Sequence, residues 1–144
     1  YASARDILGW EEESGEKIGD NDIVLVNFGW LKKYWTTGKN WKWYSMNEPG
    51  LSEDASELLL SRKIKEIGSD TVACGTALKD GKTNPDAPPP NYCWIHNNLL
   101  PKDILIIECL ANMEQVPNAC FFMALPLKIK SGSGSPIRPV AVVL

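Results

Sequence analysis

The sequence has no extended basic run and no long apolar segment. Its 144 residues carry a formal net charge of −3, and no run of Lys and Arg is longer than two residues. A nucleic-acid-binding surface needs a basic patch or stripe, so this composition argues against that class of function. No apolar run reaches the roughly 18 to 20 residues of a membrane span, and the start of the chain does not resemble a signal peptide. We therefore expect a soluble, cytoplasmic protein that binds neither nucleic acid nor membrane.

Paired cysteine motifs are also missing. The four cysteines, Cys74, Cys93, Cys109 and Cys120, show no Cys-x-x-Cys spacing. The sequence therefore supports neither a zinc ribbon nor a disulfide framework, and it favours a reducing compartment. Cys93 lies three residues before His96, the only histidine. This spacing leaves open a Cys/His metal site on one helix face, with a buried free thiol as the alternative.

Helix and strand signals alternate along the chain. Ser3 and Asp6 predict the start of a first helix that Gly15 ends. Ser52 predicts the start of a second helix, and a short third helix is expected over 93–100, closed by Pro101. Apolar, β-branched segments predict strands over the ranges 22–30, 67–76, 103–110, 120–129 and 139–144. We expect one α/β domain over 1–144, with a layered mixed β-sheet and flanking helices.

Two segments rich in small residues or proline are interpreted as loops. Residues 78–92 hold four prolines and predict a long loop with polyproline character. Residues 131–136 read Ser-Gly-Ser-Gly-Ser-Pro, which resembles a phosphate cradle only superficially. They precede a strand rather than a helix and lack a following Lys-Ser/Thr, so we interpret them as a turn.

Glu108 stands at the end of the apolar run Ile104–Ile107, which reads as a strand buried on both faces. Moving an ionised carboxylate into a dry core costs several kcal/mol even after relaxation, so Glu108 would need a partner there. Arg, Lys, backbone N–H groups or a metal could each serve, and His96 lies twelve positions earlier. Spacing alone leaves open an exposed strand end or a structural ion pair.

Residues 96–144 resemble the carboxyl-terminal half of the metal-dependent cyclase family, which includes bacterial kynurenine formamidase and isatin hydrolase, so the resemblance implies that the chain is a carboxyl-terminal portion of such a protein. The likeness is carried by a His and two leucines, a strand ending in Glu, an Asn turn, an Ala-Leu-Pro-Leu-Lys strand and a Gly-Ser-Pro-x-Arg turn. The matching positions are His96, Leu99, Leu100, Glu108, Asn112, Ala124–Lys128, Gly134–Pro136 and Arg138. Segments 19–30, 47–52 and 67–71 are similar to family segments in the same order.

The resemblance implies that His96 and Glu108 are metal ligands in a site suited to zinc or manganese. It also implies metal-assisted hydrolysis of a small aromatic or cyclic amide. Trp30, Trp41 and Trp43 are candidates for an apolar substrate wall, although such aromatics more often pack in a core or an interface. The family also implies a homo-oligomer.

One part of the family pattern does not occur in the chain. The signature His-x-Gly-Thr-His-x-Asp-x-Pro-x-His, which supplies the other ligands and a catalytic histidine, cannot lie in a chain with a single histidine. We expect either an upstream segment of a longer protein, a partner chain that carries the signature, or a descendant that no longer catalyses. The competing function is therefore a non-catalytic binding or assembly subunit that retains the fold. With the signature elsewhere, this chain alone would be inactive.

Overall fold

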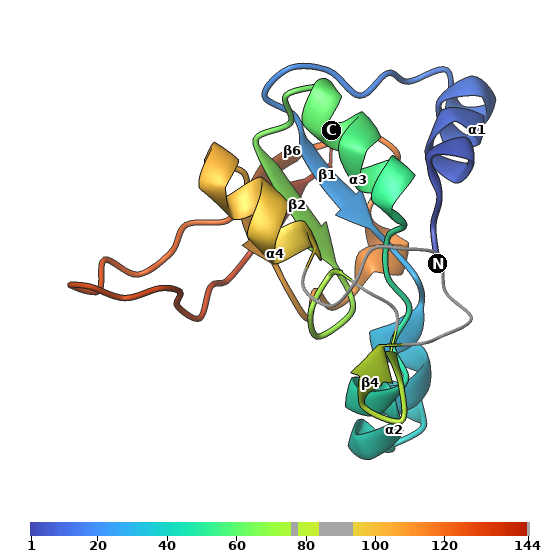
Figure 1. Cartoon of the computed structure of the whole chain (residues 1–144), viewed down its shortest axis with the longest axis vertical. Helices are drawn as coiled ribbons and strands as arrows, with labels where there is room; N and C mark the ends of the chain where they lie inside the picture. Colours follow the sequence, from blue (N-terminus) through green and yellow to red (C-terminus); the bar gives the residue numbers. More distant parts are fainter. Residues whose placement is uncertain (76–77, 84–93, 144) are drawn as a thin grey trace. The chain divides into compact units, whose positions relative to one another are not determined.

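The computed structural model describes residues 1–75, 78–83 and 94–143. These residues fall into two compact units, Tyr1–Glu114 and Gln115–Leu144. In the first unit helices and strands alternate, which confirms the α/β class (Figure 1). The expectation of a single domain over 1–144 stays a prediction.

The described residues of the first unit contain five strands, four α-helices and three short helices of other types. The strands are β1 (Ile23–Val26), β2 (Glu66–Ser69), β3 (Leu78–Lys79), β4 (Lys82–Thr83) and β5 (Leu105–Ile107). The α-helices are α1 (Ala4–Ser14), α2 (Trp41–Met46), α3 (Glu53–Ser61) and α4 (Trp94–Leu99). The π-helical segment η1 (Leu31–Thr37) and the 3-10 turns η2 (Leu100–Lys102) and η3 (Met113–Gln115) complete the set, η3 reaching one residue into the second unit. The part of the predicted proline-rich loop at 84–92 lies outside the described residues.

A parallel sheet organises the first unit. Its strand order is β1-β2-β5, and Ile67 of β2 pairs with Val24 on one side and Ile106 on the other. Parallel neighbours need crossover connections, which α2 and α3 provide between β1 and β2, and α4 provides between β2 and β5. The carboxyl ends of all three strands therefore lie at the same edge of the sheet.

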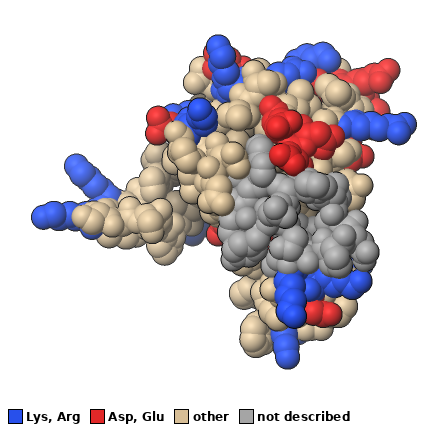
Figure 2. All heavy atoms as spheres, viewed as in Figure 1, with Lys and Arg blue, Asp and Glu red and all other residues tan. Residues whose placement is uncertain are grey.

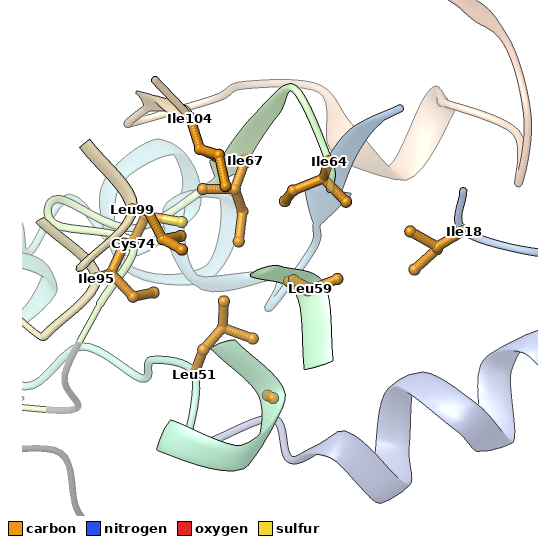
Figure 3. Close-up of a cluster of buried hydrophobic side chains, with 10 residues drawn as sticks. Ile18, Leu51, Leu59, Ile64, Ile67, Cys74, Ile95, Leu99 and Ile104 are labelled. Carbon is orange, nitrogen blue, oxygen red and sulfur yellow. The ribbon is translucent and has the colours of Figure 1, made fainter. Parts of the chain in front are cut away.

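The core lies between this sheet and the helices α3 and α4. Leu59 of α3, Ile67 of β2 and Leu99 of α4 have no exposed surface and belong to one cluster of buried side chains. Figure 3 shows these side chains pointing toward one another from their separate elements. Leu51, just before α3, and Ala55 and Leu59 within α3 are buried. Helical spacing of apolar residues is thus what attaches α3 to the sheet.

The prediction that Ile104–Ile107 is buried on both faces is wrong. Ile104 and Ile107 are 4% and 6% exposed, but Leu105 between them is 47% exposed. Within the described residues β5 pairs with β2 alone, so it is an edge strand of the sheet. Gly68 faces Leu110 and Ile107 on the side opposite α3 and α4, where a methyl group at Gly68 would lie 2.7 Å from Leu110 Cδ1. That face is covered locally near Ile107 and left open at Leu105.

Helix α1 begins and ends where its sequence predicts. The Ser3 side chain accepts from the Asp6 N–H, and the Asp6 carboxylate accepts from the Ser3 N–H at 2.7 Å, which is a reciprocal capping box. Gly15 ends the helix with φ 76°, a left-handed conformation that glycine adopts without a Cβ clash. The second predicted cap differs, because the Ser52 hydroxyl contacts Ala2 O and Asp54 Oδ1 and caps no N–H of α3.

Glu11 of α1 is a buried carboxylate with a complete set of partners. It accepts from the Ile18 N–H at 2.8 Å and pairs with Arg62 at 3.3 Å and Lys17 at 3.5 Å. The Ile18 hydrogen bond, aided by Arg62 and Lys17, lowers the pKa of Glu11 despite its burial. A carboxyl group with a lowered folded-state pKa stabilises the fold above its unfolded pKa, and that contribution is lost as the pH falls through the folded value.

We expect Glu11→Gln to destabilise the protein by about 1–2 kcal/mol at pH 7, because a neutral amide replaces a charged hydrogen-bond partner. The difference between wild type and variant should shrink as the pH falls below the ordinary glutamate pKa of 4.5 and through the lowered pKa of Glu11, because the carboxyl then binds a proton. Urea unfolding at pH 7 and at pH 3 measures both values. Glu12→Gln, on the exposed side of α1, is the matched control and should change stability little at either pH.

The second unit contains an antiparallel strand pair, β6 (Phe121–Met123) and β7 (Val140–Val142), with Phe122 opposite Ala141. Both strands lie inside the segments predicted from sequence and are shorter. The segment after β6 is apolar and open to solvent, since Leu125 and Leu127 are 79% and 62% exposed.

The charged surface agrees with the composition. On the face that Figure 2 shows, Lys and Arg side chains lie in small separate groups with acidic residues between them. In the described part of the chain, no helix is both long enough and apolar enough to cross a bilayer.

Candidate functional site

Polar and ionisable side chains gather where the parallel strands end. Asp70 directly follows β2, and Glu108 directly follows β5. Because the strands are parallel, both positions lie at the carboxyl edge of the sheet, where ligands of α/β proteins usually bind. In Figure 1 the arrowheads of β1 and β2 point toward this edge, with α2 beyond them.

His96 and Glu108 meet at this edge. Helix α4 carries His96 in its last turn, and His96 Nε2 lies 3.2 Å from Glu108 Oε1. The two side chains are 32% and 40% exposed, so Glu108 is not the buried carboxylate that the sequence suggested. The desolvation argument for a metal therefore fails for Glu108. A metal role for Glu108 depends instead on its short distance to the only imidazole of the chain.

Glu48, in the turn before α3, is the carboxyl that is buried. It is 1% exposed, and its Oε2 accepts from the N–H groups of Val72 and Ala73 at 2.5 and 3.3 Å. Its Oε1 has no hydrogen-bond partner among the described residues. Burial, with the nearby negative charge of Glu108, raises the pKa of Glu48 to about 7, against the two N–H groups that lower it.

Tyr44 of α2 connects the helical segment to the end of β2. It is fully buried, and its hydroxyl donates to the carbonyl oxygen of Asp70 at 3.1 Å. Burial first, and then the neighbouring Cys109, raise the pKa of Tyr44 well above its usual value. Burial also raises the pKa of Cys74 to about 12, so this cysteine is a neutral thiol at pH 7 and no nucleophile.

The Asp70 carboxylate organises the backbone after β1. One oxygen accepts from the Phe28 N–H at 2.8 Å, and the other accepts from Trp30 and Leu31 at 2.5 and 3.2 Å. Asp70 is 2% exposed. These three donors precede and open η1, so Asp70 fixes where the aromatic segment begins.

The three candidate substrate tryptophans lie in different surroundings. Trp30 packs against Tyr34 with ring centroids 4.3 Å apart and ring planes tilted by 56°, and its indole N–H donates to Tyr44 O at 2.9 Å. Trp43 lies 6.2 Å from the same Tyr34 ring and is 44% exposed. Trp41 is 66% exposed and makes no ring contact with another described residue. Trp30 and Trp43 thus share one aromatic cluster, and the substrate role of all three stays a prediction.

Trp43 also lines an open cavity of about 460 Å³. The other lining residues are Asn40, Lys42, Met46, Asn47 and Asp80. The lining joins one indole and one thioether to four polar or charged side chains.

Other candidate metal ligands are not brought together. Among residues 1–75, 78–83 and 94–143, no three His, Cys, Asp or Glu side chains are grouped so that they could hold an ion. Cys93, the partner of His96 in the alternative Cys/His site, lies outside the described residues.

Glu48 and Asp70 are the site residues that the sequence analysis missed. Asp70 follows a short apolar strand as Glu108 does, but the predicted strand 67–76 ran past it and hid this signal. Glu48 precedes the Pro49-Gly50 turn, and nothing in its sequence neighbourhood predicts burial.

The amino-terminal half of the chain matches a known protein family. Residues 1–75 match the family model described as "Putative cyclase". The matched residues include Glu48, Asp70 and the three candidate substrate tryptophans, whereas His96 and Glu108 lie after them.

The chain is similar to isatin hydrolases over nearly its whole length. An isatin hydrolase from Roseibium aggregatum is 34% identical over 144 aligned positions, which cover 95% of this chain and 50% of that protein. A crystal structure of an isatin hydrolase bound to the product analogue thioisatinate superposes with a TM-score of 0.77 at 34% identity, covering 99% of this chain and 52% of the other. Isatin hydrolase A from Labrenzia aggregata, bound to benzyl benzoate, gives a TM-score of 0.76 at 31% identity, covering 97% of this chain and 52% of the other. The chain thus spans about half the length of these relatives.

Proposed function

The chain belongs to the cyclase family, and from that premise we propose that it forms part of a metal-dependent hydrolase of a small cyclic or aromatic amide. The observation that carries the proposal is the 3.2 Å approach of His96 Nε2 to Glu108 Oε1 at the carboxyl edge of the sheet. The similarity to isatin hydrolases covers 95% to 99% of this chain, and it supports a cyclic amide as the substrate class.

The pair fits one divalent cation. Two donors bound to the same ion at about 2.0–2.2 Å lie about 3 Å apart at a right angle and about 3.4 Å apart at the tetrahedral angle. The observed separation of 3.2 Å lies between these values. An imidazole nitrogen with a carboxylate oxygen suits zinc or manganese. A catalytic zinc site normally has three protein ligands, so this pair needs ligands from a histidine-rich segment upstream or on a partner chain.

Different residues of this chain would bind the cation and the substrate. His96 and Glu108 would hold the cation, which when bound supplies Lewis-acid activation of water and of the amide carbonyl. The aromatic cluster of Trp30, Tyr34 and Trp43 would pack against the substrate ring, and Trp41 is a further candidate for this role. Proton transfer would fall to a histidine outside the chain.

The test is hydrolysis of isatin by the intact protein with Zn²⁺ or Mn²⁺, before and after chelation. We expect turnover that depends on the cation and on the histidine-rich segment, and no turnover by residues 1–144 alone. Turnover that survives complete chelation would contradict the metal role. Failure of the intact, cation-loaded protein to hydrolyse any cyclic amide would favour the alternative of a non-catalytic binding or assembly subunit.

We also propose a cytoplasmic location and self-association. The described cysteines Cys74, Cys109 and Cys120 are free thiols, as expected in a reducing compartment. Exposed apolar side chains after β6, among them Leu125 and Leu127, are surfaces that association would cover. Sedimentation of the intact protein would measure the oligomeric state.

A further inference from the structure

Glu48 is a buried carboxyl group that the proposed hydrolysis does not use. Its Oε2 is held by two backbone N–H groups of the turn after β2, while Oε1 has no hydrogen-bond partner in the described part of the chain. Ionisation of this buried carboxyl group is costly, because neither solvent nor a donor from the described residues pairs with Oε1. Such a group reduces the cost by binding a proton.

Glu11 shows what the same fold does with a buried Glu that stays ionised. Its side chain is 1% exposed, and Glu48 as a residue is also 1% exposed. Glu11 has Arg62 and Lys17 within 3.5 Å in addition to the Ile18 N–H. The one side-chain charge that shifts Glu48, in the described residues, is that of Glu108, and it is negative. Both side chains have almost no exposed surface, but only Glu11 has cationic partners in the part of the chain that the structure describes.

The groups around Glu48 come from helix α2 and from the segments that follow β2 and β5. Tyr44 belongs to α2, Cys74 follows β2, and Glu108 and Cys109 follow β5; each interacts electrostatically with Glu48. Asp70 also lies after β2, but three backbone N–H groups hold its carboxylate. Tyr44 and Cys74 are neutral near pH 7, since burial raises the pKa of each. A positive charge placed at Glu108 would therefore reverse the main electrostatic influence on Glu48.

We propose that Glu48 is a proton-binding residue of this site: it holds a proton while no cation occupies His96 and Glu108, and it releases that proton to solvent when a divalent cation binds there. The release half of this inference rests on the proposed metal role of the pair. The step is balanced, since the carboxylic acid and the cation give a carboxylate, the bound cation and one free proton. In this proposal Glu48 interacts electrostatically with Glu108 and does not bind the cation itself.

The first experiment needs no metal. Infrared difference spectra of the full chain between pH 6 and pH 8.5 should show the carbonyl stretch of a protonated carboxyl group that disappears as the pH rises through about 7. Glu48→Gln should remove this band, and the matched variant Glu11→Gln should retain it. A band that persists in Glu48→Gln, or wild-type spectra without such a band, would overturn the proposal. The wild-type titration decides the point even if the variant does not fold.

The second experiment measures the coupling. Calorimetric titration of the intact protein with Zn²⁺ or Mn²⁺ near pH 6, in two buffers of different ionisation enthalpy, counts the protons released on binding. Wild type should release about one proton more than Glu48→Gln, and its cation affinity should rise up to about tenfold more per pH unit below pH 7. Protons that the metal ligands release are common to both proteins and cancel in the comparison.

The two parts can fail separately. Equal proton counts in the two proteins would overturn the release step while leaving the metal site intact. If neither protein binds the cation, the metal proposal fails and the release step fails with it. The infrared band still decides whether Glu48 holds a proton in that case.

Discussion

Glu108→Ala and His96→Ala are each expected to abolish binding of Zn²⁺ or Mn²⁺ by the intact protein, together with cation-dependent amide hydrolysis. Each variant removes one of the two donors that lie 3.2 Å apart. Loss of a mere supporting residue around a metal typically costs 10- to 100-fold in affinity, so loss of a ligand should cost at least about 100-fold. Metal content after dialysis and the rate of isatin hydrolysis measure the two effects.

Stability separates this expectation from a structural role. Both side chains are substantially exposed, at 32% and 40%, so the free energy of unfolding should change by no more than about 0.5 kcal/mol. Glu114→Ala is the matched control, because Glu114 pairs with Lys32 at 2.7 Å and also follows β5. It should leave cation binding unchanged. A Glu108→Ala protein that unfolds, or that loses activity while it retains its cation, would contradict the assignment.

Local signals in the sequence predicted the start and end of α1 correctly. The capping box of Ser3 with Asp6 and the left-handed Gly15 depend on residues within one turn of the helix. Such interactions are nearly independent of tertiary structure, so sequence spacing reports them directly. Ser52 illustrates the limit, since Ala2, distant along the chain, competes for its hydroxyl.

The burial of the site residues could not be predicted in the same way. Apolar runs indicated strands, but whether a strand lies inside a sheet or at its edge depends on pairing between distant segments. Because β5 lies at an edge of the sheet, Leu105 is exposed. The Glu108 carboxylate is in contact with solvent, so its charge does not require a metal for compensation. Glu48 and Asp70 take their hydrogen bonds from distant segments, Glu48 from the turn after β2 and Asp70 from the backbone after β1. No local pattern encodes such long-range contacts.

The carboxyl edge thus uses three acidic side chains in three ways. Glu108 is accessible beside an imidazole, Glu48 is buried without a compensating charge, and Asp70 is buried with three backbone donors. Three backbone N–H groups satisfy the buried Asp70 carboxylate with hydrogen bonds. Asp70 is therefore the structural member of the three, and its loss should affect folding before chemistry.

Asp70→Ala is expected to destabilise the protein by about 3–5 kcal/mol, because it leaves the N–H groups of Phe28, Trp30 and Leu31 without their acceptor. This is a large share of the roughly 5–15 kcal/mol that stabilises a typical domain. Near-UV circular dichroism should weaken as well, since Trp30 would lose the anchor that sets its position against Tyr34. Urea unfolding followed by tryptophan fluorescence measures the stability change.

Two further variants test the reason for that loss. Asp22→Ala is the control, because Asp22 is exposed and its carboxylate accepts from the N–H of Gly19 at 2.7 Å. Its cost should stay within about 1 kcal/mol. Asp70→Asn should fall between the two, since the amide keeps one acceptor oxygen but turns an N–H₂ group toward backbone donors. If Asp70→Ala were no more costly than Asp22→Ala, the carboxylate would not be what fixes the start of η1, and the aromatic cluster would owe its position to ring packing alone.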